Sequence, residues 1–316
     1  MRDFIELAVI LPVFNEAKAI DKHFKIIYDT LKQFDSDIHF VIVDDGSIDD
    51  TWSIVQGLVK DYGDVKAIRF SRNFGKELAI FAGLESIDAQ KYVIMDSDLQ
   101  HPPKYIKDML EVMDTENADI VEGVKESRGK ESYIYKIVAT SFYRLLESLT
   151  GLKLENSSDF KIINNRVVSA LCAIKEKSLF FRGLVDWVGF KKVEFPFVVD
   201  AREDGTSRFT ARTLIRLAFT AILSHTSKPL YLTIIASGIM FVLAIILGIQ
   251  TLYNYVLGHA IGGFTTVIIL ILFSSSMIMF SLGIIGFYIS RIYDEVKGRP
   301  RYIIAENHLR DEETHE

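Results

Sequence analysis

Charged residues are missing from one long stretch of this chain. No Asp, Glu, Lys or Arg occurs in residues 229–290, although 25% of the 316 residues are charged. Residues 259–263 divide the stretch into two apolar halves, 230–252 and 264–289, and each half exceeds the roughly 20 residues that a helix needs to cross a bilayer. The sequence therefore predicts two transmembrane helices. The lack of charge within them favours an anchoring and lipid-docking role over ion transport.

Cysteine, excess positive charge and clustered histidine are also scarce. The single Cys172 excludes a disulfide within the chain and indicates a reducing compartment. The net charge of -6 argues against nucleic acid as a partner. The seven histidines show no metal-ligand spacing, so zinc is not indicated and His101 is interpreted as a loop residue. The first six residues include acidic side chains where a signal peptide needs apolar ones, so we expect the N-terminal domain to stay in the cytoplasm.

Basic residues flank the uncharged stretch on both sides. They are Arg208, Arg212, Arg216 and Lys228 before it, and Arg291, Lys297, Arg299 and Arg301 after it. The loop between the two halves has none, so the positive-inside rule predicts a multi-pass plasma-membrane protein with both termini in the cytoplasm. Residues 211–228 are predicted to form an amphipathic juxtamembrane helix on the bilayer, although a core helix has a similar pattern. Residues 291–316 are predicted to be a cytoplasmic tail, which is polar and loose after Ile304.

Short apolar runs alternate with helical patterns over residues 1–210. Strands are expected at residues 7–11, 39–43, 65–70 and 92–95, with a further edge strand at 195–199 and a polar loop at 156–161. This alternation predicts an α/β domain with a mostly parallel, doubly wound sheet. Open sheets of this kind bind ligands where the carboxyl ends of their strands meet. The side chains expected to meet there are Asp44, Asp45, Arg72, Lys76, Asp96 and Asp98.

Asp96 and Asp98 follow the fourth predicted strand, one residue apart. Two such carboxylates repel each other unless a cation lies between them, and a hard divalent ion is the simplest candidate. Mg²⁺ keeps few protein ligands and takes the others from water and substrate phosphates. The pair therefore predicts a metal that holds a diphosphate, although an isolated Asp-x-Asp is more often a solvated turn.

Four ordered motifs carry a resemblance to a known family. They are Leu-Pro-Val-Phe-Asn-Glu at residues 11–16, Val-Asp-Asp-Gly-Ser at 43–47, Ser-Arg-Asn-Phe-Gly-Lys at 71–76, and Asp-Ser-Asp-Leu-Gln-His-Pro-Pro at 96–103. Together with the apolar hairpin, they resemble the family 2 polyprenyl-phosphate glycosyltransferases, which include dolichol-phosphate mannose synthase and bacterial undecaprenyl-phosphate (bactoprenol) glucosyltransferases. The resemblance implies a GT-A fold, which is Rossmann-like with a mostly parallel sheet. It also implies a nucleotide-diphosphate sugar donor, a Mg²⁺ or Mn²⁺ cofactor, and inversion at the sugar carbon.

The resemblance assigns roles on the donor side of the site. The residues that would bind the nucleotide sugar are Pro12, Phe14, Glu16, Asp44, Asp45, Lys76 and Asp96. Asp44 would accept a hydrogen bond from uracil, and Asp96 would face the ribose and the metal. Asp98 would ligate the metal directly, as a catalytic residue, with Gln100 supporting the metal site. For Arg72 and Lys76 a second interpretation stays open, in which they only pair with Glu77 or Asp45.

The acceptor side needs positive charge more than it needs a base. A phosphate monoester has a second pKa of about 6, so the acceptor oxygen is already anionic at neutral pH. The residues that match the family's acceptor and diphosphate region are Lys125, Arg128, Lys136, Arg202 and Arg208. The family more often has Arg at position 125 and Lys at position 208, so charge is kept there while bidentate geometry is not. Asp159 matches the residue usually named as the catalytic base, and a role in orienting the acceptor or a basic residue stays open beside that one.

The reaction predicted from the resemblance is transfer of a single sugar from a UDP-sugar to undecaprenyl phosphate, for cell-surface polymer glycosylation. Glucose or N-acetylglucosamine is favoured, and mannose stays open. Expected partners are the lipid bilayer, a flippase and a downstream transferase, with a homo-oligomer as an option. One alternative is a processive polysaccharide synthase, but the chain has no Gln-x-x-Arg-Trp sequence and only two predicted spans. Another is a non-catalytic nucleotide-sugar sensor or scaffold, which the gathered carboxylates disfavour.

Overall fold

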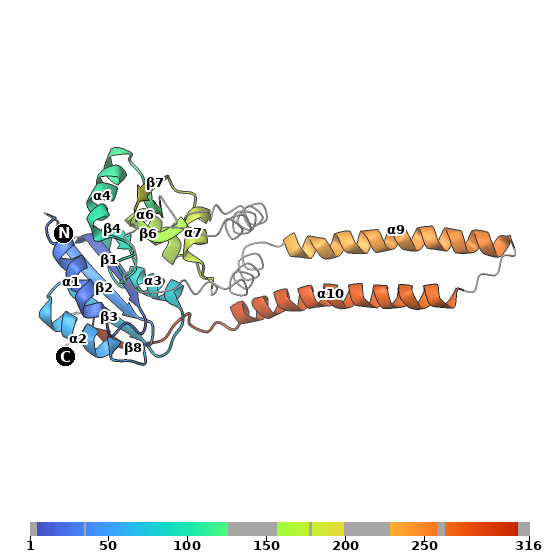
Figure 1. The fold of residues 1–316 in the computed structure, drawn as a ribbon, viewed down its shortest axis with the longest axis horizontal. Helices are drawn as coiled ribbons and strands as arrows, with labels where there is room; N and C mark the ends of the chain where they lie inside the picture. The colour runs from blue at the N-terminus through green and yellow to red at the C-terminus, as the bar shows by residue number, and fades with distance from the viewer. Residues whose placement is uncertain are drawn as a thin grey trace. The chain divides into compact units, whose positions relative to one another are not determined.

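The structure is a computed structural model that describes residues 5–34, 36–125, 157–176, 179–198, 228–257 and 263–308. Contacts divide the chain into two units, of which the first comprises Met1–Arg208 together with Pro300–Glu316 and the second Phe209–Arg299. The first, here called the α/β unit, contains a single sheet flanked by helices, and the second contains two long helices (Figure 1). Residues Pro300–Glu316, which follow the two long helices, therefore belong to the same unit as the N-terminal residues.

Eight strands form the sheet of the α/β unit. In chain order they are β1 (Ile5–Val13), β2 (Ile38–Asp44), β3 (Val65–Phe70), β4 (Ala89–Ile94), β5 (Ile120–Lys125), β6 (Ser157–Asn164), β7 (Lys192–Phe197) and β8 (Ile304–His308). Their order across the sheet is β7-β5-β6-β4-β1-β2-β3-β8. Only β6 and β8 run antiparallel to their neighbours, while the other six strands share one direction. The predicted mostly parallel sheet is confirmed.

Helices cover both faces of this sheet (Figure 1). One face packs against α1 (Ile20–Leu31), α2 (Thr51–Asp61) and α4 (Ile106–Thr115), which the short 3-10 helix η1 (Pro103–Tyr105) precedes. The other packs against α3 (Lys76–Glu85), α6 (Asn165–Cys172) and α7 (Phe181–Trp187). Strand β1 is buried from Leu7 to Val13 because it lies between two neighbours and under both layers. Two apolar cores, one on each face, hold the strand ends in place.

Two expectations about the strands were wrong. Strand β1 continues through Pro12, because its pairing with β4 ends at Ile10 and the missing N–H therefore breaks no bond on that side. Residues 157–161 form the first part of β6 rather than a polar loop. The charged side chains of Asp159 and Lys161 gave this segment the composition of a loop, but both are buried in ion pairs.

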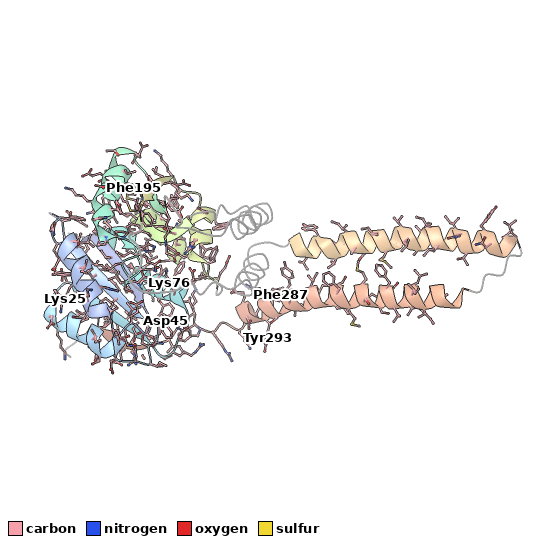
Figure 2. The ribbon with its side chains drawn as sticks, in the orientation of Figure 1. Lys25, Asp45, Lys76, Phe195, Phe287 and Tyr293 are labelled. Carbon is pink, nitrogen blue, oxygen red and sulfur yellow. The ribbon has the colours of Figure 1, made fainter. Side chains whose placement is uncertain are left out.

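The described residues of the second unit include α9 (Lys228–Val256) and α10 (Phe264–Val296), which run antiparallel side by side. Both helices are long and apolar enough to cross a membrane. Their apolar side chains project outward (Figure 2), and Ile239, Phe241 and Ile249 are each between 64% and 69% exposed. The predicted juxtamembrane helix lies outside the described residues except for Lys228, with which α9 begins. The orientation in the membrane stays a prediction.

The predicted loose tail is replaced, over residues 304–308, by strand β8. This strand pairs antiparallel with β3, with Ala67 opposite His308 and Phe70 opposite Ile304. Without β8, the outer edge of β3 would present unpaired N–H and C=O groups to solvent. The chain after α10 thus completes the sheet that the N-terminal residues begin.

Candidate functional site

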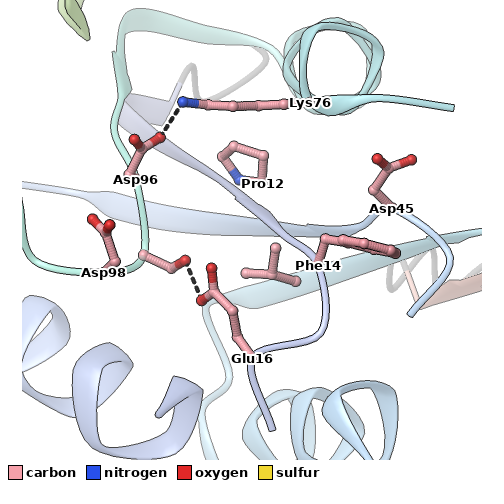
Figure 3. A pocket seen from close by; sticks show the side chains of 9 residues that line it. Pro12, Phe14, Glu16, Asp45, Lys76, Asp96 and Asp98 are labelled. Carbon is pink, nitrogen blue, oxygen red and sulfur yellow. Dashed lines mark hydrogen bonds and ion pairs between the residues drawn. The ribbon is translucent and has the colours of Figure 1, made fainter. Parts of the chain in front are cut away.

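A pocket opens at the carboxyl ends of the central strands (Figure 3). It is lined by Pro12, Val13, Phe14, Glu16, Asp45, Lys76, Asp96, Ser97 and Asp98. Every residue predicted to bind the nucleotide sugar except Asp44 therefore lines this one pocket. They meet because β1, β2 and β4 end at the same edge of the sheet, and α3 starts there with Lys76.

Lys76 bridges two carboxylates at this pocket. Its Nζ lies 2.5 Å from Asp96 Oδ1 and 2.6 Å from Asp159 Oδ2, and Figure 3 shows the first of these ion pairs. Burial disfavours the charged amine, but the two carboxylates outweigh it and raise the pKa of Lys76. The alternative in which Lys76 pairs with Glu77 or Asp45 is therefore wrong. Instead, Lys76 links Asp96, in the loop after β4, to Asp159 of β6.

Asp159 is held by a second cation, Arg182, at the start of α7. Arg182 Nε lies 2.6 Å from Asp159 Oδ1, and Nη2 lies 3.0 Å from Oδ2, a bidentate pair. Burial raises the pKa of Asp159, but Arg182 and Lys76 outweigh burial and bring that pKa well below its usual value. A carboxylate with so low a pKa is a poor proton acceptor at neutral pH. The geometry favours the orienting role over the role of base.

Glu16 lines the pocket together with Asp45, Asp96 and Asp98. Its Oε2 accepts a hydrogen bond from Ser97 Oγ at 2.5 Å, and its backbone N–H donates to Thr51 Oγ1 at 2.8 Å. Burial, together with the charges of Asp98 and Asp96, raises the pKa of Glu16 to about 7 against the opposing effect of the Ser97 hydrogen bond. The pocket is therefore crowded with acidic oxygens that a cation would stabilise.

Asp98 and Gln100 form a hydrogen-bonded pair in the loop that follows β4. Asp98 is exposed, and its two carboxylate oxygens accept from the backbone N–H of Gln100 at 3.1 Å and from Gln100 Nε2 at 2.5 Å. Within the described ranges, no three or more His, Cys, Asp or Glu residues gather as metal ligands. Two carboxylates are nevertheless enough for Mg²⁺ or Mn²⁺ when phosphate and water supply the other ligands. Asp96 and Asp98 fit such an ion, with Gln100 holding Asp98.

His101 lies beside this pair but serves the loop. It is 3% exposed, and its Nδ1 accepts the backbone N–H of Asp96 at 2.9 Å. Its ring stacks on Phe160, with the centroids 5.1 Å apart, and burial lowers its pKa to about 4. His101 is therefore a neutral residue that shapes the Asp96 turn, in agreement with its interpretation as a loop residue.

The two acidic residues at the end of β2 have different partners. Asp44 is fully buried, and its Oδ1 accepts from the backbone N–H and the hydroxyl of Ser47. Burial raises the pKa of Asp44 against these hydrogen bonds. Asp45 accepts from the backbone N–H groups of Phe74 at 2.7 Å and Gly75 at 2.9 Å. Asp45 thereby fixes the loop that leads into α3, so it positions Lys76 as well as lining the pocket.

Replacing Gly46 by alanine is expected to lower the melting temperature and to weaken nucleotide binding together. Gly46 has φ +68°, and a Cβ there would lie 2.3 Å from the backbone carbonyl carbon of Arg72. Backbone strain and the forced shift together should cost about 2 kcal/mol or more. Thermal unfolding in detergent and a nucleotide titration would measure the two effects. Gly57→Ala in α2, where a Cβ meets nothing within 4 Å, should leave nucleotide binding unchanged and raise the melting temperature slightly, because alanine is the better helix former. A Gly46→Ala protein that shows neither loss would contradict the expectation.

Sequence reasoning missed Arg182 and Glu77 as parts of the site. Glu77 Oε2 accepts the backbone N–H of Phe181 at 2.7 Å, which ties α3 to the start of α7. Burial and the charge of Asp159 raise the pKa of Glu77 to about 7. The sequence signal for Arg182 was its place as the second residue of a short apolar helix. Its partner Asp159 lies 23 residues away in the chain, so no local pattern indicated the pair.

Only part of the predicted acceptor region can be located. Lys125 ends β5, opposite Phe197 of β7, and is half-buried. The other predicted acceptor residues, which lie outside the described residues, are Arg128, Lys136, Arg202 and Arg208. Their roles stay predictions. Arg72, predicted near the nucleotide or in a pair, donates to the backbone oxygen of Asn73 and lies over the Phe74 ring at 4.0 Å.

Known proteins similar to this chain extend along nearly its whole length. The uncharacterized glycosyltransferase YkcC of Bacillus subtilis (strain 168) is 33% identical over 98% of this chain and 96% of its own length. The SfII prophage-derived bactoprenol glucosyl transferase of Shigella flexneri is 32% identical over 96% and 99%. Among solved structures, glucosyl-3-phosphoglycerate synthase from Mycobacterium tuberculosis is 19% identical, with a TM-score of 0.48 over 70% of this chain and 80% of that one. The sequence profile of glycosyl transferase family 2 matches residues 8–183, and the chain belongs to that family.

Proposed function

We propose that this glycosyltransferase moves one sugar from a UDP-sugar to a polyprenyl phosphate, undecaprenyl phosphate in a bacterial membrane, with inversion at the sugar carbon. The observation that carries the proposal is the combination, in one chain, of a cation-bridged carboxylate pocket and an exposed apolar hairpin. The pocket suits a nucleotide diphosphate with a metal, and the hairpin suits a lipid-borne acceptor. The relative from Shigella flexneri, named a bactoprenol glucosyl transferase, supports the acceptor class.

On the donor side, the base is proposed to lie beside Pro12, Phe14 and Asp44, and the diphosphate near Lys76. Asp96 and Asp98 would hold Mg²⁺ or Mn²⁺. When bound, such an ion neutralises the charge that develops on the departing diphosphate. Lys76 contributes positive charge at the same place, because its amine points into the pocket.

On the acceptor side, the chain needs to position an anion rather than create one. The phosphate oxygen of the lipid attacks the sugar carbon opposite the leaving diphosphate, so one bond forms as the other breaks and the configuration inverts. Basic residues bring the two phosphate groups together, and the residues proposed for this are Lys125, Arg128, Lys136, Arg202 and Arg208. Asp159 is proposed to orient Lys76 and Arg182.

The hairpin is proposed to anchor the enzyme so that its active site faces the cytoplasmic leaflet. About 20 apolar residues span a bilayer, and both helices exceed that length. Exposed apolar surface of this extent is unfavourable in water and is covered by lipid tails in a membrane. The product would then remain in the membrane, where a flippase and a further transferase could use it for surface glycosylation.

Transfer to undecaprenyl phosphate in detergent is the test of this proposal. Given radiolabelled UDP-glucose, UDP-N-acetylglucosamine and GDP-mannose in turn, the full chain is expected to convert one of the two UDP-sugars into a product that organic solvent extracts, only when Mg²⁺ or Mn²⁺ is present. Analysis of the anomer in the released sugar would test inversion. Omitting the lipid phosphate should abolish the product. Hydrolysis of a donor without lipid product would contradict the acceptor, and a GDP-mannose product would contradict the uridine donor.

A further inference from the structure

Strand β8 lies against the nucleotide end of the site, although the hairpin separates it in sequence from every other strand. It pairs with β3, and the backbone N–H of Ser71 donates to the carbonyl of Ile303 at 2.9 Å just beyond the strand. Tyr302 stacks on Phe70 with the ring centroids 4.8 Å apart, and its hydroxyl donates to Glu85 Oε2. Strand β8 and the two residues before it, Tyr302 and Ile303, are therefore all held in place by contacts with the rest of the α/β unit.

One acidic side chain of β8, that of Glu306, reaches Arg69 across the strand pair. Arg69 and Glu306 are register partners, and Arg69 Nη1 donates to Glu306 Oε1 at 3.1 Å. Gln56 of α2 donates to the other carboxylate oxygen at 3.3 Å. The Glu306 side chain is 41% exposed, so this pair contributes little to overall stability. The effect of the ion pair is instead to orient the Arg69 guanidinium.

The opposite side of the Arg69 guanidinium holds the turn that follows β2. Its Nη2 donates to the backbone oxygen of Ser47 at 3.2 Å, and its Nε lies 3.5 Å from Asp44 Oδ2. Asp44 Oδ2 is buried and has no hydrogen-bond partner among the described residues. Arg69 therefore supplies a positive charge at this oxygen, while Ser47 holds the other oxygen of the same carboxylate.

The same turn also holds the loop after β1. Ser47 Oγ donates to Asp44 Oδ1 and accepts the backbone N–H of Asn15 at 2.9 Å. Asn15 follows Phe14, which lines the pocket described above and a second pocket. That second pocket is also lined by Gly46, Ser47, Ile48, Arg69, Phe70, Ser71, Arg72, Asn73 and Ala305. Residues of β8, of β3 and of the β2 turn thus share one surface next to Phe14.

We propose that Glu306 is a positioning residue of the donor site, which acts through Arg69 on Asp44 and Ser47 and so sets the affinity for the nucleotide. The proposal deepens the proposed function and rests on it, because it takes Asp44 and Phe14 as the nucleotide end of the site. It makes the strand that follows the membrane hairpin part of the donor-binding machinery. Glu306 itself contacts neither the sugar nor the diphosphate and should leave the chemical step alone.

The test is Glu306→Gln in the full chain, with UDP as the probe and the transfer assay as a second readout. We expect the dissociation constant for UDP and the KM for the donor to rise about five- to tenfold, with kcat within twofold of wild type. Arg69→Met should weaken UDP binding at least as much, and the double variant no more than Arg69→Met alone, because both substitutions break the same chain of contacts. Glu306→Asp, which keeps the charge, should recover part of the affinity.

His308→Ala is the matched control. His308 lies on the same strand, stacks on Trp52 with the centroids 5.5 Å apart and lies 3.3 Å from Gln56 Nε2. By no described interaction does it contact Arg69 itself, whose guanidinium lies over the Trp52 ring at 5.7 Å. Its loss should weaken the packing of β8 without changing UDP affinity. Equal UDP affinity in Glu306→Gln and wild type would overturn the proposal, as would an equal weakening by His308→Ala, since β8 would then act only as an edge strand. A wild-type protein that binds GDP but not UDP would overturn the uridine donor alone, and the same comparisons would then be made with GDP. A wild-type protein that binds neither would overturn the proposed function and this inference together.

Discussion

Asp159→Asn is expected to lower turnover about 100-fold or more, and Arg182→Gln is expected to lower it by a similar factor. Asp159 receives Lys76 on one oxygen and the Arg182 guanidinium on both. Replacing either partner of a largely buried, bidentate pair leaves the other charge without its counterion, which typically costs about 3–5 kcal/mol. Displaced cations no longer meet the diphosphate or the acceptor phosphate in the transition state. Steady-state transfer assays on the two variants would measure the losses.

The turnover of Arg182→Gln, in which the pKa of Asp159 changes, separates the orienting role of Asp159 from the role of base. The pKa of Asp159 is depressed, so its stabilising effect is present above the ordinary carboxyl pKa of about 4 and is lost only as pH falls through the lower folded value. The wild-type rate should therefore show no acidic limb from Asp159 between about pH 5 and 9. In Arg182→Gln the pKa of Asp159 should rise toward its usual value. If Asp159 were the catalytic base, this higher pKa would make it a better proton acceptor, so Arg182→Gln would keep its turnover.

Asp186→Asn is the matched control for these two variants. Asp186 lies on α7 with Arg182 and pairs with Lys192 at 2.5 Å, away from Lys76. Its loss tests whether any disturbed ion pair on α7 is enough to stop transfer, and a turnover within a few fold of wild type is expected. An inactive Asp159→Asn beside an Arg182→Gln of wild-type turnover would contradict the orienting role and restore the base.

The parts of the fold that the sequence predicted are those with a local periodic signal. Strands β1 to β4 are buried apolar runs that end in polar loops, and α1 repeats apolar residues at helical spacing with Ile20, Phe24 and Ile27 fully buried. The mostly parallel sheet and the convergence of Asp45, Lys76 and Asp96 followed from the β-α alternation, because the carboxyl ends of parallel strands share an edge. The GT-A fold was implied by the resemblance of the four motifs to a known family.

The parts that were missed depend on partners far away in the chain. Lys161 in β6 is buried only because Glu122 of β5 neutralises it, and no local pattern contains that information. Strand β8 is five residues long, with Ile304 as its single large apolar residue, and it forms because β3 presents a free edge 237 residues earlier. Propensity describes a segment alone, whereas these two segments are defined by their neighbours.

Lys76→Met is expected to lower turnover about 100-fold or more and, in the absence of nucleotide, to bind Mn²⁺ about tenfold more tightly. Lys76 Nζ lies 2.5 Å from Asp96 Oδ1, so the amine occupies an oxygen that a metal at Asp96 and Asp98 would use. A cation there would also be repelled by the ammonium charge. Removing the charge relieves both effects, while the departing diphosphate loses a positive partner.

Titration of Mn²⁺ by electron paramagnetic resonance, together with the transfer assay, would measure the two opposite changes. Lys76→Arg keeps the charge and should keep Mn²⁺ affinity near wild type, although its planar fork fits the space between Asp96 and Asp159 differently. Asp98→Ala should remove most Mn²⁺ binding in either background, since it deletes the exposed carboxylate of the pair. Unchanged Mn²⁺ affinity in Lys76→Met would contradict the competition for Asp96, and unchanged turnover would contradict the contact with the diphosphate. Tighter metal binding with lost turnover would mean that the lysine keeps Asp96 from binding metal until a nucleotide draws the amine to its phosphates.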